Sequence, residues 1–446
     1  MNTIQTIPRE IQEIIFEQLP QKNFIKIASV SKYFNEFLKK IQWNNIRIVI
    51  FKNQYVSLIT GVYNFTKIDL SECDFIVDEN LEHFGNCREL NLRKCKLITD
   101  NGIKYLKNCN TLNLYKCTSI TDDGLKHLGN CNTLDLSWCS TITDLGLEYI
   151  KNCTKLNLYQ CTSITDNGLK YLKNCIELNL SRCRRITNIG LQYLKNCHKL
   201  NLKGCKLITD AGLRHIENCY ELILCDNGHL ISEVGLRYLT NLSTLTLARE
   251  ILISDTGLQH LTNLSVLELN CSRVTDKGLR HLGSFRELYL YGCTSITNVG
   301  LQYLGNCQVL YLSGCHLTDA CLQHFVSCQK LYLSGCTSIT NIGLQYLKNC
   351  IELHLDGCHL ITDLGLQYLM NIHHLTFSRC NSITDEGLKY LRNVHYLKFY
   401  KCNSITFEGL KYLDNCCEVT LIEKKKNNNH IYQITTLCGN VRVIHR

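Results

Sequence analysis

Residues 112–133 read Leu-Asn-Leu-Tyr-Lys-Cys-Thr-Ser-Ile-Thr-Asp-Asp-Gly-Leu-Lys-His-Leu-Gly-Asn-Cys-Asn-Thr, and this stretch contains one complete unit of a pattern that fills most of the chain. Leu112 and Leu114 are two residues apart, which is the spacing of side chains on one face of a strand. Leu125 and Leu128 are three apart and therefore share one face of a helix. The stretch predicts a short strand, a turn, a short helix and a second turn.

The pattern recurs about every 22 residues between Ile68 and Glu418. The Thr-Asp pair at 121 and 122 supplies side-chain oxygens that accept hydrogen bonds from the free N–H groups at a helix start. One unit alone cannot bury its apolar side, so neighbouring units must stack strand beside strand. Sixteen units begin at Ile68, Leu90, Leu112, Leu134, Leu156, Leu178, Leu200, Leu222, Leu245, Leu267, Leu288, Leu310, Leu331, Leu353, Leu375 and Leu397.

This unit resembles the leucine-rich repeats, and within them the subclass in which cysteine replaces the asparagine that follows the strand. The resemblance implies an α/β fold, a right-handed solenoid with a parallel sheet on its concave side and helices on its convex side. Between Cys225 and Asp276 the repeat cysteines are replaced, for example by Asn227 and Glu250. Neutral drift between two better-matched blocks explains this, and a change of curvature or a loop directed at a ligand is the alternative.

Most of the 29 cysteines occupy two positions of the repeat, those of Cys117 and Cys131. A chain with a large core does not need disulfides, and a free cysteine behaves as a small buried hydrophobe. No C-x₂-C pair is present, and one thiol per repeat cannot assemble four zinc ligands. We therefore expect reduced core thiols, no metal site and a reducing compartment, the cytoplasm or the nucleus.

Charge and hydropathy exclude two further classes of partner. The formal net charge is +9, but Lys and Arg recur in the helical half of every unit and are dispersed, whereas nucleic-acid binding needs clustered charge. No apolar stretch is long enough to span a membrane, and residues 1–10 do not resemble a secretory signal. We expect no nucleic-acid or membrane partner, and a monomer in the absence of other proteins.

The first 45 residues have a different pattern, with two apolar helical stripes and the only two prolines, Pro8 and Pro20. Pro8 is placed where a helix begins, and Pro20 ends that helix. The run Ile7-Pro8-Arg9-Glu10, the Leu-Pro pair at 19 and 20, and Val30-Ser31-Lys32-x-Phe34 resemble an F-box, with Trp43 in its third helix. The predicted domains are an F-box at 1–45, a linker and cap at 46–67, the repeats at 68–418, and a C-terminal cap with a basic loop at 419–446.

The F-box resemblance implies an apolar helical surface that binds the Skp-type adaptor of a cullin RING ubiquitin ligase. Some of the apolar residues must instead pack internally, and the sequence does not separate the two groups. The candidates for adaptor binding are Pro8, Ile11, Ile15, Phe16, Leu19, Pro20, Phe24, Ile27 and Val30.

Residues that flank the two strand leucines should face the concave side of the solenoid. The asparagine column that includes Asn113 is expected to form a hydrogen-bonded ladder between strands. Tyr, Trp and Arg dominate protein-binding hot spots, and they occur at these concave positions. The substrate-binding candidates are Tyr115, Trp138, Tyr159, Arg182, Tyr289, Tyr291, Tyr311 and Tyr332.

No phosphate loop, metal motif or nucleophile-base grouping stands apart from the repeat positions. The sequence therefore predicts a protein that is not an enzyme and uses no cofactor. The resemblance implies a substrate receptor of an SCF-type ligase, which holds a protein substrate on the concave face for ubiquitination. The alternative is an interaction scaffold whose N-terminal helices only cap the solenoid.

Overall fold

The computed structural model describes residues 42–49, 64–422, 432–437 and 440–445, except for 227–229, 248–252, 262, 270–272, 292, 293, 313, 403, 407 and 414. The chain divides into two compact units, Met1–Cys219 and Tyr220–Arg446. All of the adaptor-binding candidates, from Pro8 to Val30, lie outside the described residues.

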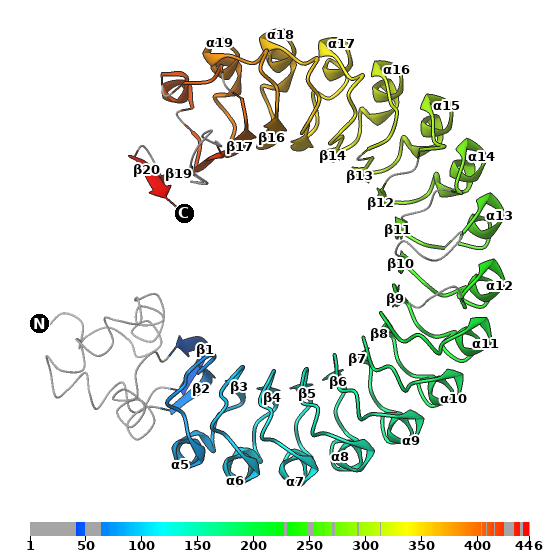
Figure 1. Cartoon of the computed structure of the whole chain (residues 1–446), viewed down its shortest axis with the longest axis vertical. Helices are drawn as coiled ribbons and strands as arrows, with labels where there is room; N and C mark the ends of the chain where they lie inside the picture. Colours follow the sequence, from blue (N-terminus) through cyan, green and yellow to red (C-terminus); the bar gives the residue numbers. More distant parts are fainter. Residues whose placement is uncertain are drawn as a thin grey trace, which may run out of the picture. The chain divides into compact units, whose positions relative to one another are not determined.

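The first unit is a parallel sheet with one short helix after each repeat strand, and the helices lie on the convex side of the sheet (Figure 1). Its strands are β1 (Gln42–Val49), β2 (Asn64–Asp69), β3 (Glu89–Asn91), β4 (Thr111–Asn113), β5 (Thr133–Asp135), β6 (Lys155–Asn157), β7 (Glu177–Asn179) and β8 (Lys199–Asn201). Its α-helices are α5 (Asp78–Leu81), α6 (Asp100–Ile103), α7 (Asp122–Leu125), α8 (Asp144–Tyr149), α9 (Asp166–Leu169), α10 (Asn188–Leu191) and α11 (Asp210–Leu213), and two 3₁₀ turns follow, η2 (Glu82–Phe84) and η3 (Lys104–Leu106).

The second unit repeats this architecture and ends in a separate antiparallel hairpin, β19 with β20. Its strands are β9 (Glu221–Leu224), β10 (Thr244–Leu247), β11 (Val266–Leu269), β12 (Glu287–Leu290), β13 (Val309–Tyr311), β14 (Lys330–Tyr332), β15 (Glu352–His354), β16 (His374–Ser378), β17 (Tyr396–Tyr400), β18 (Glu418–Ile422), β19 (Tyr432–Leu437) and β20 (Asn440–His445). Its helices are α12 (Glu233–Leu236), α13 (Asp255–Leu258), α14 (Asp276–Leu279), α15 (Asn298–Leu301), α16 (Asp319–Leu322), α17 (Asn341–Leu344), α18 (Asp363–Leu366) and α19 (Asp385–Leu388), with 3₁₀ turns η4 (Arg280–Leu282), η5 (Gln302–Leu304), η6 (Gln323–Phe325), η7 (Gln367–Leu369), η8 (Lys389–Leu391) and η9 (Gly409–Tyr412).

The predicted leucine-rich-repeat solenoid is confirmed in each unit. Leu112 of β4 is paired with Leu134 of β5, so the first strand leucine keeps its register from repeat to repeat. Both leucines of the strand and both leucines of the helix are buried, as Leu114 and Leu125 illustrate. In the described part of the chain, no helix has the length and apolar character required to cross a bilayer.

The sheet extends one strand beyond the predicted repeats at each end. Ile48 of β1 is paired with Ile68, and Val419 of β18 is paired with Leu397. Trp43, which the sequence analysis places in a third helix, lies in β1 instead. The alternating Ile46 and Ile48 suit a strand, and pairing satisfies the backbone groups that the edge of β2 would otherwise expose.

The repeat cysteines that the structure describes are buried, as the sequence predicts. The Cys117 thiol donates to the backbone oxygen of Leu92 in the preceding repeat at 3.1 Å. In the second column, the Cys109 thiol lies 3.5 Å from the Arg88 oxygen and 3.2 Å from that of Thr111. Cys117 and Cys109 therefore fill core volume and also donate to backbone carbonyls.

A Thr-Asp ladder connects the helix starts, and the sequence analysis did not find it. The Thr121 hydroxyl accepts from the Asp123 N–H, which is the predicted cap. The same threonine is also held by Asp100 of the preceding repeat, whose carboxylate accepts from the Thr121 nitrogen at 2.8 Å and from its hydroxyl at 2.6 Å. A Cβ at Gly124 would lie 2.4 Å from Asp100 Oδ1, so the Thr-Asp-x-Gly motif interlocks successive repeats.

The repeats that lack the cysteines differ locally from their neighbours. Strands β9 to β11 of these repeats are four residues long, as is the following β12, whereas β3 to β8 are three residues long. The positive φ before the turn position persists, with 58° at Lys116 in the first unit and 55° at Asp226, which precedes Asn227.

Candidate protein-binding surface

The concave face of the first unit carries large side chains just after each strand. Asn113 accepts at 2.9 Å from the backbone N–H of Tyr115, and Asn157 accepts at 3.1 Å from that of Tyr159. The predicted asparagine ladder between strands is correct only in part. Asn157 donates to Asp135 of the preceding repeat at 3.2 Å, whereas Asn113 accepts from Tyr115 of its own repeat. The column therefore mainly fixes the backbone that carries each tyrosine.

The next residue in each repeat adopts the left-handed conformation. The φ values are 58° at Lys116, 65° at Trp138 and 59° at Arg182. This conformation costs roughly 1–2 kcal/mol for a residue with a Cβ. The backbone N–H groups are satisfied there, because that of Trp138 donates to the Tyr159 oxygen at 2.8 Å.

These columns bring cations and rings of five repeats together. The Lys116 ammonium lies 4.7 Å from the ring of Trp138 and 5.4 Å from that of Tyr115. Trp138 meets Tyr159 edge to face, with ring centroids 5.9 Å apart. We call this set the cation–aromatic ladder; it consists of Arg93, Tyr115, Lys116, Trp138, Tyr159 and Arg182.

The cations of this ladder form no ion pair in the described residues. Within the part of the chain that the structure describes, no ion pair involves Arg93, Lys116 or Arg182. By contrast, Lys94 at the edge of the same face lies 2.7 Å from a carboxylate oxygen of Glu72. The ladder is thus a positively charged and aromatic strip, which suits a protein partner that supplies negative charge.

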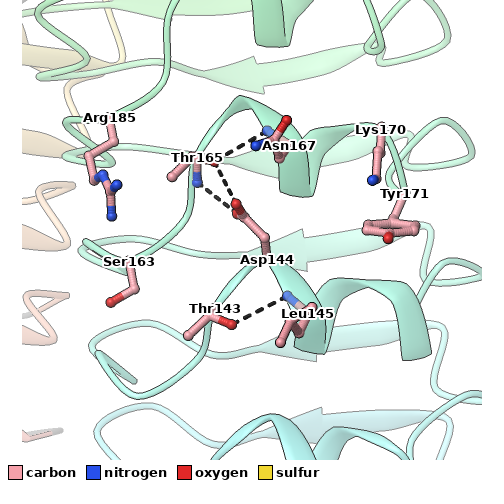
Figure 2. Close-up of a pocket in the computed structure, with 9 residues that line it drawn as sticks. All are labelled: Thr143, Asp144, Leu145, Ser163, Thr165, Asn167, Lys170, Tyr171 and Arg185. Atoms are coloured by element: carbon pink, nitrogen blue, oxygen red, sulfur yellow. Dashed lines mark hydrogen bonds between the residues drawn. The ribbon is translucent and has the colours of Figure 1, made fainter.

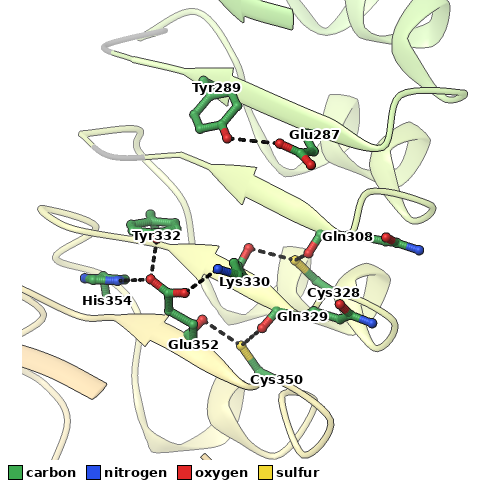
Figure 3. Close-up of polar contacts among 10 residues, drawn as sticks. All are labelled: Glu287, Tyr289, Gln308, Cys328, Gln329, Lys330, Tyr332, Cys350, Glu352 and His354. Atoms are coloured by element: carbon green, nitrogen blue, oxygen red, sulfur yellow. Dashed lines mark hydrogen bonds and ion pairs between the residues drawn. The ribbon is translucent and has the colours of Figure 1, made fainter. Parts of the chain in front are cut away.

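The second unit carries a stack of aromatic rings at the strand ends, and Figure 3 draws Tyr289, Tyr332 and His354 of this stack. Tyr311 and Tyr332 stack with centroids 3.5 Å apart and an interplanar angle of 10°. Tyr332 and His354 continue the stack at 4.0 Å. Tyr289 tilts against Tyr311 at 4.3 Å, and Tyr291 lies 6.0 Å from it.

An acidic residue neutralises the charge beside this stack, in contrast to the first unit. Glu352 accepts from the Tyr332 hydroxyl, lies 2.9 Å from the Lys330 ammonium and lies 3.1 Å from His354 Nε2. Burial raises the pKa of Glu352, but these three hydrogen bonds outweigh burial and lower the pKa to about 2. Burial and the bond to Glu352 raise the pKa of Tyr332. The polar groups of Tyr332 and His354 thus have a hydrogen-bond partner within the chain.

A shallow depression of about 770 Å³ lies at the helix starts of the first unit (Figure 2). Its polar groups serve the Thr-Asp ladder, since Asp144 accepts from the Thr165 nitrogen at 2.8 Å and from its hydroxyl. Lys170 lies over the ring of Tyr171 at 4.7 Å. The remaining lining residues are Thr143, Leu145, Ser163, Asn167 and Arg185.

The structure thus brings the substrate-binding candidates together in two sets, one in each unit. Tyr115, Trp138, Tyr159 and Arg182 belong to the cation–aromatic ladder. Tyr289, Tyr291, Tyr311 and Tyr332 belong to the stack. The sequence analysis missed Glu352 and His354 of the stack. The signal for His354 is its position, because it is paired in register with Tyr332.

Comparisons with known proteins identify both parts of the chain. A family model for the F-box domain matches residues 4–44, and a leucine-rich-repeat model matches residues 88–107, 132–151, 260–283 and 368–391. A search of curated proteins finds no match.

Three solved structures are similar to this chain at low identity. An internalin from Listeria monocytogenes is 18% identical, with a TM-score of 0.43, over 84% of this chain and 94% of that one. The match in the yeast Rad7–Elc1 complex is 16% identical, with a TM-score of 0.45, over 90% of this chain and 93% of that one. The match in the Drosophila Toll–Spätzle complex is 14% identical, with a TM-score of 0.46, over 84% of this chain and 57% of that one. With an F-box domain at its start and leucine-rich repeats behind it, the chain is an F-box and leucine-rich-repeat protein.

Proposed function

We propose that the chain is the substrate receptor of an SCF-type ubiquitin ligase. Its F-box binds a Skp-type adaptor and, through it, a cullin, while its repeats hold a protein substrate. The observation that carries the proposal is the F-box match at residues 4–44 directly ahead of a repeat array. We place this function in the cytoplasm or the nucleus, where the buried cysteines remain reduced.

The junction between the two parts supports a receptor with a fixed geometry. β1 begins at Gln42, inside the F-box match, and is paired with β2 of the repeat sheet. The last residues of the F-box match are therefore hydrogen-bonded to the sheet. A bound substrate would then be held at a defined position relative to the adaptor, which a substrate receptor requires.

The chemistry of the described residues supports a role in positioning rather than in catalysis. A catalytic cysteine needs a lowered pKa and access to its substrate. Burial instead raises the pKa of the Cys109 and Cys139 thiols to about 12. The partner ligase subunits would supply the reactive groups, and this chain would supply the binding surfaces.

Copurification with the adaptor tests the proposal. The double variant Ile11→Asp plus Leu19→Asp places two charges on the predicted adaptor-binding stripe and should abolish recovery of the adaptor. The matched control Leu97→Asp plus Leu207→Asp introduces the same charges at exposed repeat positions and should retain the adaptor. Equal recovery with the wild type and the F-box variant would reject the ligase role and leave the interaction scaffold.

A further inference from the structure

We propose that the cation–aromatic ladder of the first unit binds an acidic segment of the substrate, whose carboxylate or phosphate groups engage Lys116 and Arg182. The inference rests on the proposed function, because it names the substrate chemistry that this receptor would select. Its basis is that Lys116 and Arg182 form no ion pair with any carboxylate of the described chain.

The backbone conformation gives the first argument. Lys116 and Arg182 have φ values of 58° and 59°, in the region that favours glycine. Some repeats place glycine at the equivalent position, as Gly314 and Gly335 show with φ values of 77° and 82°, so the fold does not require a long side chain there. Lys94 at the same position pairs with Glu72, whereas Lys116 and Arg182 form no ion pair in the described part of the chain, so we assign these two an intermolecular use.

The packing holds these cations ready for a ligand. The Lys116 ammonium rests over Trp138 at 4.7 Å, and the Arg182 guanidinium lies 5.8 Å from the ring centre of Tyr159. Gly204 leaves room for Arg182, because a Cβ there would lie 3.1 Å from Arg182 Cγ. Ring contacts of this kind restrict a long side chain before binding, which reduces the entropy lost on binding.

The spacing of the cations defines the ligand further. Lys116 and Arg182 are three repeats apart, and strand spacing places their backbones roughly 14 Å from each other. An extended peptide advances about 3.3 Å per residue. Two acidic residues four positions apart therefore match the two cations, in a segment that runs across the strands.

The ring faces argue against single-stranded nucleic acid, which also combines negative charge with stacking. Nucleic-acid binding of that kind uses open aromatic faces on which bases stack. In the ladder, Arg93 lies 4.8 Å from the ring centre of Tyr115, and Lys116 lies over Trp138. The cations that would bind phosphates already cover these rings, so anionic side chains of a polypeptide fit the strip better than bases.

Fluorescence polarisation on the full chain tests the inference with defined probes. The first is a labelled ten-residue Gly-Ser peptide with glutamate at positions 3 and 7, and the second has phosphoserine there. A third has glutamine at both positions, and a ten-residue uridine oligomer is the fourth. We expect one of the two anionic peptides to bind at least about tenfold more tightly than the glutamine peptide.

Substitutions then locate the binding. Lys116→Gln plus Arg182→Gln should weaken binding of the anionic peptide by about tenfold or more. Glutamine is compatible with the backbone, because Gln160 has a φ of 65° at the same repeat position. The control Lys173→Gln plus Lys195→Gln removes the same charge from exposed helical-side positions and should change binding less than about twofold.

The outcomes separate this inference from the proposed function. Tighter binding by the phosphoserine peptide identifies a phosphorylated segment, and tighter binding by the glutamate peptide identifies an acidic one. Absence of peptide binding, equal weakening by both double variants, or preference for the uridine oligomer would overturn the inference. The ladder variant should still recover the adaptor. Loss of adaptor recovery by the wild type with intact peptide binding would reject only the ligase role.

Discussion

Asp100 of one repeat accepts two hydrogen bonds from Thr121 of the next, at 2.8 Å from its nitrogen and 2.6 Å from its hydroxyl. The threonine also caps its own helix, so one side chain connects two repeats and starts a helix. In a solenoid, stability depends on the contacts between neighbouring repeats. The carboxylate of each repeat is therefore expected to contribute strongly to the stability of the array.

Replacement of one ladder carboxylate tests that expectation. Asp122→Ala removes both acceptors of Thr143 and should lower the free energy of unfolding by about 2–3 kcal/mol, since hydrogen bonds to charged groups are involved. Asp122→Asn should cost less than about 1 kcal/mol, because Asn188 keeps both contacts to Thr209: it accepts from the Thr209 nitrogen and donates to the Thr209 hydroxyl. Urea unfolding followed by circular dichroism measures both, and an unchanged free energy of unfolding for Asp122→Ala would show that the ladder does not stabilise the array.

The ladder also reverses the usual effect of a glycine replacement in a helix. Gly→Ala inside a helix normally stabilises by about 1 kcal/mol. Gly124→Ala should instead destabilise the protein, because the new Cβ would lie 2.4 Å from Asp100 Oδ1 and displace the carboxylate. Gly85→Ala is the control, since its nearest neighbour would be at 3.4 Å. A melting temperature of the Gly124 variant at or above that of the control would contradict this account.

The repeat geometry was predictable because it depends on the spacing of residues within one repeat. The spacing of Leu112 and Leu114 predicts a strand face, and that of Leu125 and Leu128 predicts a helix face, without any knowledge of neighbouring repeats. The role of Asp100 was not predictable, because its partners belong to the following repeat and Thr-Asp already had an explanation as a cap. Local spacing also fails for β1, which precedes the first complete unit.

The candidate site was predictable in its residue types but not in its energetics. Tyrosine and tryptophan at concave positions indicate a binding surface. The left-handed backbone at Trp138 could not be predicted, because the residue at this position varies among Lys, Trp, Gln and Arg instead of remaining glycine. The role of Glu352 beside the aromatic stack could not be predicted either, since Glu352 lies at a repeat position whose earlier occupants include Thr133 and Lys199.

The Glu352 network should make stability depend on acid pH. Its pKa is about 2 in the folded protein and 4.5 in a model peptide, so the unfolded state binds protons first as the pH falls. The ionised Glu352 therefore contributes about 2–3 kcal/mol to the free energy of unfolding. This contribution is complete above pH 4.5 and is lost between pH 4.5 and 2. Glu352→Gln should reduce this loss of stability at low pH in unfolding measurements at pH 6, 4 and 3. An unchanged loss of stability would contradict the network, and Glu148→Gln, at an exposed helix position, is the control.

The buried thiols should produce the opposite dependence at alkaline pH. Burial raises the pKa of Cys109 and Cys139 from 9.0 to about 12, so the unfolded state loses its protons first as the pH rises. Stability is complete below pH 9 and falls between pH 9 and 12, by about 1.4 kcal/mol per pH unit for each such thiol. Urea midpoints at pH 8, 9 and 10 measure the loss.

Alkylation at pH 8 provides the control for the thiols. The half-buried Cys417 should react with iodoacetamide, whereas Cys109 and Cys139 should react only after unfolding in urea. Peptide mapping identifies the modified positions. Rapid modification of Cys109 in the folded protein would contradict its burial.

The cation–aromatic ladder predicts a conflict between stability and binding at Lys116. Lys116→Gly relieves a positive φ, worth roughly 1–2 kcal/mol, and incurs about 0.5–1 kcal/mol of glycine entropy, so the free energy of unfolding should stay unchanged or rise by up to about 1.5 kcal/mol. The same change removes the ammonium over Trp138 and should weaken binding of the anionic peptide. Lys107→Gly is the control, because Lys107 has a φ of −58° and glycine there should only destabilise. If Lys116→Gly instead lowered stability as Lys107→Gly does and left peptide binding intact, the lysine would serve the fold, and its strained conformation would need no ligand to explain it.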